Sequence, residues 1–404
     1  MNNTIPPINL QEGYKATAFL TKDGVEVTSI EAVQNEIVKP ELEPSDNSLY
    51  KNILQGKPTN ALSGASSRRA SYNPITKTGS NMTSEGGEVF LNHYNAIALN
   101  VPAKKLLDAL TIALTLNIPN KDEIKKMSVE ELTSVINQRR TVTLTVDEYM
   151  DLCGLKDRKE ARKSLKASLE AIYNIDLEWD EERYIIPEGK KRRVKELVHF
   201  HTRVASTRGE IKRSGDIVFS FNMDLAEYLA NAYIMPYPTA LFKISAKYNP
   251  YSYSIGRKLA EHHNMNIGKS NANIISVESL IKRVQDLPSY DEVMSEKRQI
   301  NQRIIEPFER DIEALVANGM LRSWEYTNAS NQPLTDEQLK TMDYSTWVKL
   351  LIHFELESYP DQTERLARLE AKKEQAKKRK ENAVKRAKSK AKEITGEEKP
   401  ADKE

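Results

Sequence analysis

The chain has 404 residues, of which 29% are charged and 39% hydrophobic, and its formal net charge is +2. This length predicts two or three domains with hydrophobic cores, in a soluble globular protein with some disordered stretches. The longest apolar runs, such as residues 111–116, are too short to cross a bilayer. We expect no secretory signal, and the single cysteine, Cys153, excludes an internal disulfide, so a cytoplasmic protein is expected.

The charge is distributed unevenly along the chain. Residues 365–392 contain thirteen Lys and Arg against three Glu, a net charge of +10, whereas residues 393–404 carry −3 and the rest carry −5. A mildly acidic body with a basic tail is common in proteins that bind a polyanion. A charged helix that keeps a protein soluble has the same composition, and the charge alone does not separate the two.

The N-terminal segment, residues 1–88, is rich in Asn, Ser, Thr, Gly and Pro and has no sustained hydrophobic period. It is predicted to be disordered or a linker, with too little apolar surface to belong to the core. Order is expected to begin near Val89. A first helix is predicted at residues 102–116, because apolar residues recur there at i, i+3 or i+4, and i+7.

Two capping boxes mark the start of the next helices. Ser128 is followed three residues later by Glu131, and Thr145 is followed in the same way by Glu148. A short alternating strand is predicted between them, and Gly154 is predicted to end the second helix.

A longer helix is predicted at residues 158–173, after a tight turn. Strands are then predicted at 175–179, 183–186, 195–204 and 216–221. Helix, strand, helix, turn, helix and hairpin is the element order of a winged helix. We therefore expect a first winged-helix domain at residues 89–240.

A similar order recurs in the second half, without residue-by-residue identity between the halves. The prediction comprises helices at 250–263 and 277–285, a turn at 287–296, a helix at 296–306 that Pro307 restarts or kinks, a stop at Gly319, and paired strands at 321–327 and 347–356 around a polar loop. This predicts a second winged-helix domain at 241–360. Residues 361–404 are predicted to be a basic helical tail, because strong helix formers occupy 362–395 without Gly or Pro.

Basic side chains gather on one side of the helix predicted at 158–173. At 100° per residue, the apolar positions fall in one sector and the basic positions fall in the neighbouring sector of about 140°. The basic sector contains Arg158, Lys159, Arg162, Lys163 and Lys166. A solvated amphipathic helix would show the same pattern, but the preceding short helix and turn favour contact with a DNA major groove.

A second candidate set lies on the helix predicted at 296–306. Arg can pair with guanine, and Asn or Gln with adenine, so Lys297, Arg298, Asn301 and Gln302 suit base edges; an exposed polar helix face is the alternative. The basic loop at 189–195 is a candidate wing tip or linker that contacts phosphates. Its candidate residues are Lys190, Lys191, Arg192 and Arg193.

Three patterns raise the question of catalysis. His199 and His201 share one face of a predicted strand and could bind a divalent metal, as in rolling-circle nicking enzymes, but no partner acid or signature tyrosine helix is evident. Gly268-Lys269-Ser270 lacks the glycine that a phosphate loop requires five positions earlier. His262 and His263 are expected to lie at a helix end. We expect no metal, no cofactor and no enzymatic activity.

The span from about residue 89 to 356 resembles the tandem winged-helix plasmid replication initiators, the Rep family. RTVTLTVDEYMDLCGLKDRKEARKSLKASLEAIYN is similar to the first winged helix of that family, and SEKRQINQRIIEPFERDIEALVANGMLRSWEY to part of the second. The most specific piece is the basic helix that ends in Glu306-Pro307. The resemblance implies binding to repeated origin sequences, melting of nearby DNA and recruitment of the host replisome. It also implies that Arg298, Asn301, Gln302 and Arg303 contact bases.

The sequence thus predicts an α+β, mostly helical protein of two winged helices that initiates replication at a plasmid or mobile-element origin. The expected partners are double-stranded origin DNA and host replisome proteins, with a homodimer as one option for the oligomeric state and no membrane. The alternatives are a winged-helix transcriptional regulator and a metal-dependent nicking enzyme that uses His199 and His201.

Overall fold

The computed structural model describes most of the chain between residues 49 and 363. The described residues are 8–10, 14–21, 24–32, 49–65, 80–84, 87–93, 99–119, 121–124, 126–185, 194–284, 286–296, 298–363, 366, 367, 370, 371, 374, 375 and 378. The chain divides into two compact units, residues 1–360 and residues 361–404. In the second unit, the described residues from 366 to 378 are helical. None of the described helices is long and apolar enough to span a membrane.

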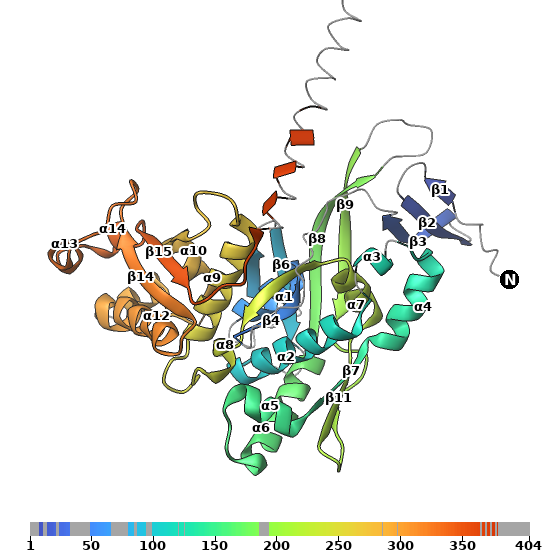
Figure 1. Cartoon of the computed structure of the whole chain (residues 1–404), viewed down its shortest axis with the longest axis horizontal. Helices are drawn as coiled ribbons and strands as arrows, with labels where there is room; N and C mark the ends of the chain where they lie inside the picture. The colour runs from blue at the N-terminus through green and yellow to red at the C-terminus, as the bar shows by residue number, and fades with distance from the viewer. Residues whose placement is uncertain are drawn as a thin grey trace, which may run out of the picture. The chain divides into compact units, whose positions relative to one another are not determined.

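The first winged helix is present in the first unit, at the lower end of the view in Figure 1. Its elements are α2 (Val101–Asn117), β7 (Thr141–Thr145), α5 (Val146–Cys153), α6 (Arg158–Tyr173), β10 (Glu210–Ile211) and β11 (Asp216–Ser220). The strands form an antiparallel sheet in the order β10-β11-β7. As the helical spacing predicts, α6 buries Ala161, Leu165, Leu169 and Ile172. The short α3 (Lys121–Ile124) and α4 (Val129–Arg139) are inserted between α2 and β7.

Local sequence signals account for the ends of these helices. Ser128 Oγ accepts a hydrogen bond from the Glu131 backbone N–H, and the Glu131 carboxylate accepts one from the Ser128 N–H at 2.8 Å. Thr145 and Glu148 form the same reciprocal pair at the start of α5, and the N–H and O–H groups of Thr145 lower the pKa of Glu148. Helix α5 ends at Gly154, whose φ of 65° lies in the left-handed region. Both predicted capping boxes and the predicted stop are confirmed.

The long hairpin after α6 is not the wing of the first winged helix, and the sequence-based expectation is wrong on this point. β8 (Ile175–Ile185) and β9 (Val194–Arg203) pair in a separate sheet with β5 (Ser80–Ser84) and β6 (Gly87–His93), in the order β5-β6-β8-β9. Three alternate side chains of β8 are buried, so this strand needs a core-facing sheet of its own. They are Ile175, Leu177 and Trp179. The wing is the β10–β11 hairpin, because β11 pairs with β7.

Residues 49–65, expected as part of a disordered segment, belong to the core. β4 (Tyr50–Gln55) pairs with β12 (Tyr233–Pro238), and α1 (Lys57–Gly64) follows it. The core side chains of this segment are Tyr50, Ile53, Leu54, Ala61, Leu62 and Ala65, all at most 3% exposed. The apolar run in β4 is too short to give a periodic signal, so only its partner strand, some 180 residues later, reveals its place. Further N-terminal, β1 (Ile8–Leu10), β2 (Tyr14–Thr21) and β3 (Gly24–Ala32) form an antiparallel sheet.

The connection between the two winged helices consists of α7 (Met223–Ala230), β12 and α8 (Ala240–Lys243). The second winged helix then repeats the topology of the first. Its elements are α9 (Ser252–Asn266), β13 (Ile274–Ser276), α10 (Val277–Arg283), α12 (Glu306–Ala317), β14 (Leu321–Thr327) and β15 (Leu351–Leu356). The sheet order is β13-β15-β14, so the strand before the second helix again pairs with the last strand of the unit. The mixed α and β fold with two winged helices, predicted from the element order, is confirmed.

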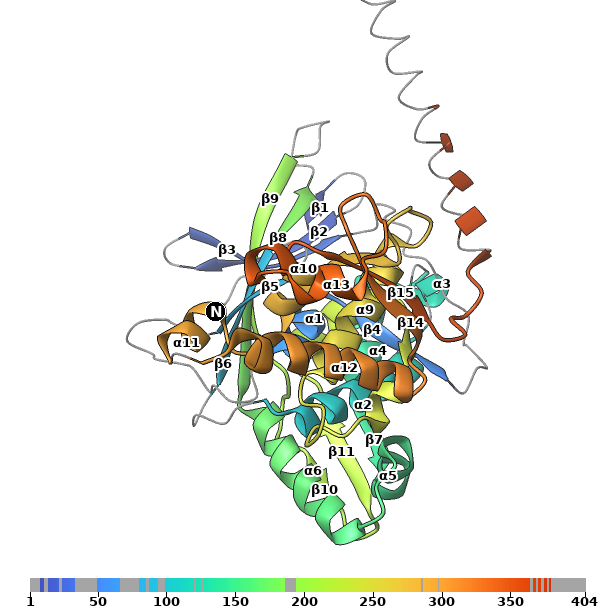
Figure 2. The ribbon, with the colours of Figure 1, turned by 90° about the vertical axis from the view of Figure 1, so that its left-hand side faces the viewer.

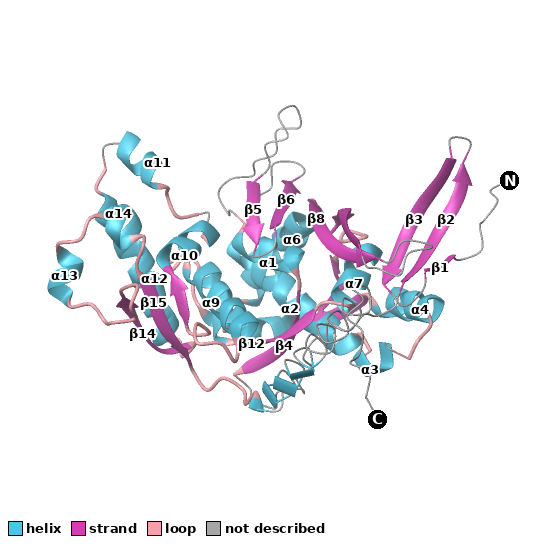
Figure 3. Ribbon diagram, turned by 90° about the horizontal axis from the view of Figure 1, so that it is seen from above, coloured by secondary structure: helices cyan, strands magenta, loops and turns pink. Residues whose placement is uncertain are grey.

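Three short helices lie where the sequence predicted a turn, a loop and the start of a strand. α11 (Tyr290–Ser295) has a capping box of Ser289 and Glu292, a signal that the sequence prediction overlooked. α13 (Asp336–Lys340) and α14 (Tyr344–Trp347) interrupt the polar segment between β14 and β15, which delays the start of β15 to Leu351. All three lie at the outer side of the second winged helix (Figure 3).

Candidate nucleic-acid interface

Helix α6, the third helix of the first winged helix and the predicted recognition helix, presents its basic residues to solvent. Arg158, Lys159, Lys163 and Lys166 are exposed, and Arg162 is half-buried. Asp157 caps the helix, because its Oδ1 accepts hydrogen bonds from the backbone N–H groups of Lys159 at 2.8 Å and Glu160 at 3.0 Å. The cap fixes the first turn, which is the part of a recognition helix that contacts base edges.

The wing lies against the same turns of α6. Arg162 Nη2 donates a hydrogen bond to the Lys212 carbonyl at 2.9 Å, and the Gly215 carbonyl accepts one from Val146 N–H at the start of α5. Gly215 has a φ of 103°, and a Cβ there would lie 3.0 Å from Arg158 Nη2. The tip between β10 and β11 therefore sits beside the basic side of α6.

Two basic residues of this wing were missed by the sequence analysis. Lys212 and Arg213 are exposed at the β10–β11 turn. The available signal was a pair of basic residues directly before a Ser-Gly turn. We call the whole set the first basic surface; it comprises Arg158, Lys159, Arg162, Lys163, Lys166, Lys212 and Arg213.

The predicted loop residues Lys190, Lys191, Arg192 and Arg193 lie outside the described residues, as does Lys297. The strands that flank the 189–195 loop belong to the β5-β6-β8-β9 sheet, so of the two expectations for this loop, a wing tip or a linker, the wing tip is wrong. Its contact with phosphates stays a prediction.

The helix predicted at 296–306, the candidate recognition helix of the second winged helix, starts later than predicted. α11 ends at Ser295, and the Arg298 backbone N–H bonds to the Val293 carbonyl, so Arg298 lies in the turn before the helix and not on it. Helical structure begins with a π-helical turn, η2 (Asn301–Ile305), that continues into α12. Pro307 lies in the first turn of α12 and has no N–H, so the regular hydrogen-bond ladder is interrupted there, in agreement with the predicted restart.

The predicted base-contacting residues at the start of this helix are nevertheless exposed. Arg298, Asn301, Gln302 and Arg303 are all exposed, whereas Ile304 is fully buried. Arg298 Nε lies 2.9 Å from Glu296 Oε2, and in the first recognition helix Arg158 Nη1 lies 3.1 Å from Asp147 Oδ1. All four partners are half exposed or more, and such surface ion pairs contribute little, so both arginines can exchange partners. Figure 2 shows α12 across the front of the second winged helix and α6 in the lower part of the first.

His199 and His201 lie on the exposed face of β9, with acids of β8 directly opposite. His199 Nδ1 is 2.9 Å from Asp180 Oδ1, and His201 Nε2 is 3.8 Å from both Asp176 Oδ2 and Glu178 Oε1. Sequence reasoning found no acid partner, because cross-strand pairing decides which acids face the histidines. Among the described residues, no group of three or more His, Cys, Asp or Glu is arranged to hold a metal ion.

The other two patterns lie in and after α9. His262 Nε2 is 3.0 Å from the Asn271 carbonyl oxygen, and His263 Nδ1 is 2.7 Å from Asn273 Oδ1. Lys269 Nζ donates to Asn266 Oδ1 at 3.0 Å. Both histidines, which lie in the last turns of α9 as expected, thus hold the loop that leads to β13.

Comparison with known proteins supports the assignment of the first winged helix. Residues 101–249 match the family model described as "Initiator Replication protein, WH1". This span begins with α2 and includes α6 and the β10–β11 wing. The resemblance to replication initiators inferred from the sequence is confirmed by this match. A search of curated proteins finds no match to the chain.

Two solved structures are similar at low identity. One is described as selenomethionine derivatives of domains 2 and 3 of RctB; it has 9% identity and a TM-score of 0.37, with 80% of this chain and 97% of that chain covered. The other, of RctB domains 2-3, has 12% identity and a TM-score of 0.35, with 73% of this chain and 96% of that chain covered. Since both TM-scores are below 0.5, these similarities carry no weight for the fold or for the function.

Proposed function

We propose that this chain, whose residues 101–249 match the family model of the initiator replication protein WH1 domain, binds double-stranded origin DNA and initiates replication there without catalysis. The proposed action is sequence-specific binding, local melting of adjacent DNA and recruitment of the host replisome. The family match supports a DNA-binding initiator, and the origin, the melting and the replisome belong to the proposal.

The observation that carries this proposal is the pair of winged helices in one compact unit, each with polar and basic residues at the start of its third helix. A winged helix contacts a major groove through the N-terminal part of its third helix and contacts the backbone through its wing. Two such units in one chain can occupy two grooves of one site.

The proposed roles differ between the two surfaces. The first basic surface carries seven cations, so it would supply phosphate contacts along one groove, with some of its arginines at base edges. Arg298, Asn301, Gln302 and Arg303 combine two arginines with two amides, a set suited to guanine and adenine edges. Lys297, the basic loop at 189–195 and the basic tail would add phosphate contacts.

Selection from random duplexes tests sequence-specific binding. The full chain should enrich one consensus, and Arg298→Ala should weaken binding to it by about 1–3 kcal/mol while changing binding to a scrambled duplex much less. Lys243→Ala is the matched control, because Lys243 is an exposed cation at the end of α8, outside both recognition helices. Failure to enrich any consensus would refute the proposal.

A supercoiled plasmid that carries the selected sequence tests initiation. The protein should make the DNA next to the site sensitive to a single-strand-specific reagent and should leave both strands uncut when Mg²⁺ or Mn²⁺ is added. Binding without melting would indicate a transcriptional regulator. A nick with a protein–DNA adduct that His199→Gln with His201→Gln abolishes would indicate a nicking enzyme.

A further inference from the structure

Four charged side chains are buried together between the two winged helices. They are Asp108 of α2, Arg257 and Glu261 of α9, and Arg283 of α10, and each is at most 5% exposed. We call them the buried ion network. Its two positive and two negative charges balance, and the neighbouring buried Lys104 has Asp286 as an opposite charge, which is the condition under which buried charges are tolerated.

Arg257 is the centre of this network. Its Nε donates to Glu261 Oε1 at 3.1 Å, its Nη2 lies 3.9 Å from Asp108 Oδ1, and its guanidinium lies 5.1 Å from the centroid of the Tyr237 ring. Tyr253 of α9 adds a hydrogen bond from its hydroxyl to Asp108 Oδ2 at 2.5 Å. The hydrogen bond from Tyr253 to Asp108 joins α9 to α2 directionally, and the Arg257–Asp108 ion pair adds attraction between the same two helices, so a sliding or rotation of one helix against the other would disrupt both.

The remaining member, Arg283, extends the network to α1. Its Nη2 lies 3.2 Å from each carboxylate oxygen of Glu261 and donates to Ser63 Oγ at 2.5 Å. Gly64 leaves the space for this arginine, because a Cβ there would lie 2.6 Å from Arg283 Cδ.

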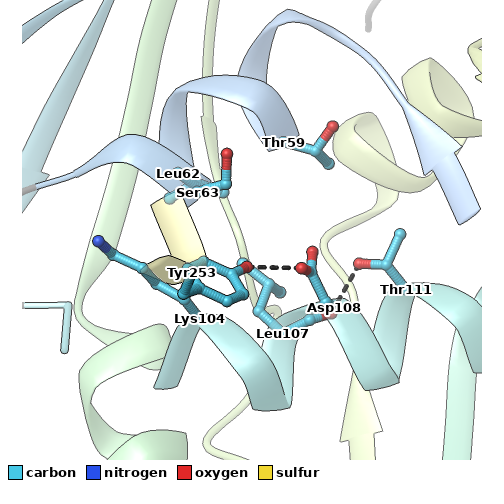
Figure 4. Close-up of a pocket in the computed structure, with 8 residues that line it drawn as sticks. All are labelled: Thr59, Leu62, Ser63, Lys104, Leu107, Asp108, Thr111 and Tyr253. Atoms are coloured by element: carbon cyan, nitrogen blue, oxygen red, sulfur yellow. Dashed lines mark hydrogen bonds between the residues drawn. The ribbon is translucent and has the colours of Figure 1, made fainter. Parts of the chain in front are cut away.

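A small cavity adjoins the network, and its size bears on the role of these charges. Its volume is about 10 Å³, and Asp108, Tyr253, Lys104 and Ser63 are among its lining residues (Figure 4). This volume is what one water molecule needs. It leaves no room for a larger ligand, so the charged groups face one another and hold the two winged helices together.

Each recognition helix is in turn fixed to one of these two helices. In the second winged helix, Asp311 of α12 is fully buried. Its Oδ2 accepts hydrogen bonds from the backbone N–H groups of Tyr251 at 2.5 Å and Ser252 at 3.0 Å, at the start of α9. Gly256 of α9 lets α12 approach, since a Cβ there would lie 2.9 Å from Leu315 Cδ2. In the first winged helix, α6 packs directly on α2.

We propose that the buried ion network, with Arg257 as its positioning residue, holds α6 and α12 at one separation. The chain therefore accepts a single spacing between the two halves of its DNA site. The inference rests on the proposed function, because it concerns the DNA that this function requires. One inserted base pair would move the second half-site by about 3.4 Å along the axis and about 34° around it. A rigid pair of recognition helices cannot follow that change.

The experiment uses the full chain and the consensus from selection, with none, one, two or five base pairs inserted between the protected halves. Wild type should lose at least about tenfold in affinity at one inserted base pair, the cost of a typical mismatch or more. Arg257→Met should reduce this loss to less than about threefold, with a smaller decrease in affinity for the uninserted site. Arg257→Lys, which keeps the charge, should restore part of the spacing preference.

Two further variants keep the test interpretable. Tyr253→Phe retains the ring and removes only its hydrogen bond to Asp108, so it tests the network if Arg257→Met does not fold. Tyr326→Phe is the matched control, because its hydroxyl accepts a buried hydrogen bond from Trp347 within the second winged helix. Tyr253→Phe should broaden the accepted spacing, and Tyr326→Phe should not.

The outcomes separate the inference from the proposed function. If wild type tolerates all insertions, or if the Arg257 and Tyr253 variants keep the wild-type spacing penalty, the inference is overturned while sequence-specific binding stands. A consensus that spans only one groove would also overturn it. If no consensus is selected at all, the proposed function fails first.

Discussion

Lys104 offers a direct test of the buried interior through the pH dependence of stability. The side chain is 1% exposed, and its ammonium group donates to the Ala65 carbonyl at the end of α1. Burial lowers the pKa of Lys104 from 10.5 to about 8, although Asp286 nearby acts in the opposite direction. Between these two values the unfolded chain binds a proton that the folded chain does not, so the free energy of unfolding should rise with pH there.

The magnitude follows from the two pKa values. From about pH 7.5 to about pH 9.5, this single group should add about 2 kcal/mol to the free energy of unfolding. Lys104→Met removes the titration, so the difference in stability between wild type and variant should change by about this amount over the same interval. The sign of this change is set by the lower pKa in the folded state. As the pH rises, the free energy of unfolding of wild type increases relative to that of the variant, because the buried lysine loses its charge.

Urea unfolding followed by tryptophan fluorescence measures this difference. The chain has three tryptophans, Trp179 in β8, Trp324 in β14 and Trp347 in α14, so the second winged helix and the β5-β6-β8-β9 sheet contain probes. Lys156→Met is the matched control for removing a lysine at an exposed position. If the Lys104→Met difference stays constant across the interval, Lys104 is not buried as a titrating ammonium group, and the packing of α1 on α2 is wrong.

Three further changes test other parts of the structure. A fragment of residues 66–404 should fail to fold cooperatively, because it lacks β4 and the core residues of α1, whereas a fragment of residues 49–404 should fold. Thermal melting of both fragments followed by circular dichroism measures this, and a cooperative melt of the 66–404 fragment would contradict the prediction. Asp157→Ala should lower stability by about 1 kcal/mol and weaken DNA binding, because the cap of α6 is lost, and unchanged values in both assays would speak against its role. Gly154→Ala should lower the free energy of unfolding by about 1 kcal/mol through backbone strain alone, since nothing lies within 4 Å of the added Cβ. DNA affinity should stay as in wild type, and an unchanged urea midpoint would argue against the left-handed turn.

The local signals in this sequence were sufficient wherever a structure depends on neighbours within a few residues. The capping boxes at Ser128 and Thr145, the stop at Gly154 and the apolar face of α6 are all set by contacts of three to seven residues' range, and each prediction is confirmed. The element order built from them predicted two winged helices, and separate sequence stretches carried the resemblance to replication initiators. The capping box at Ser289 was equally legible, and overlooking it displaced the predicted start of the second recognition helix.

Long-range strand pairing determined the parts of the fold that the sequence did not predict, because the sequence of a strand does not identify the strand with which it pairs. Tyr50–Gln55 belongs to the core only through β12. The wing was misplaced because β8 pairs with β6 and β9, whereas β11 pairs with β10 and β7. The acids opposite His199 and His201 depend on the register of that same hairpin. The buried ion network joins residues from three helices that are up to 175 positions apart, and a charged residue in a sequence looks exposed until the fold supplies an opposite charge.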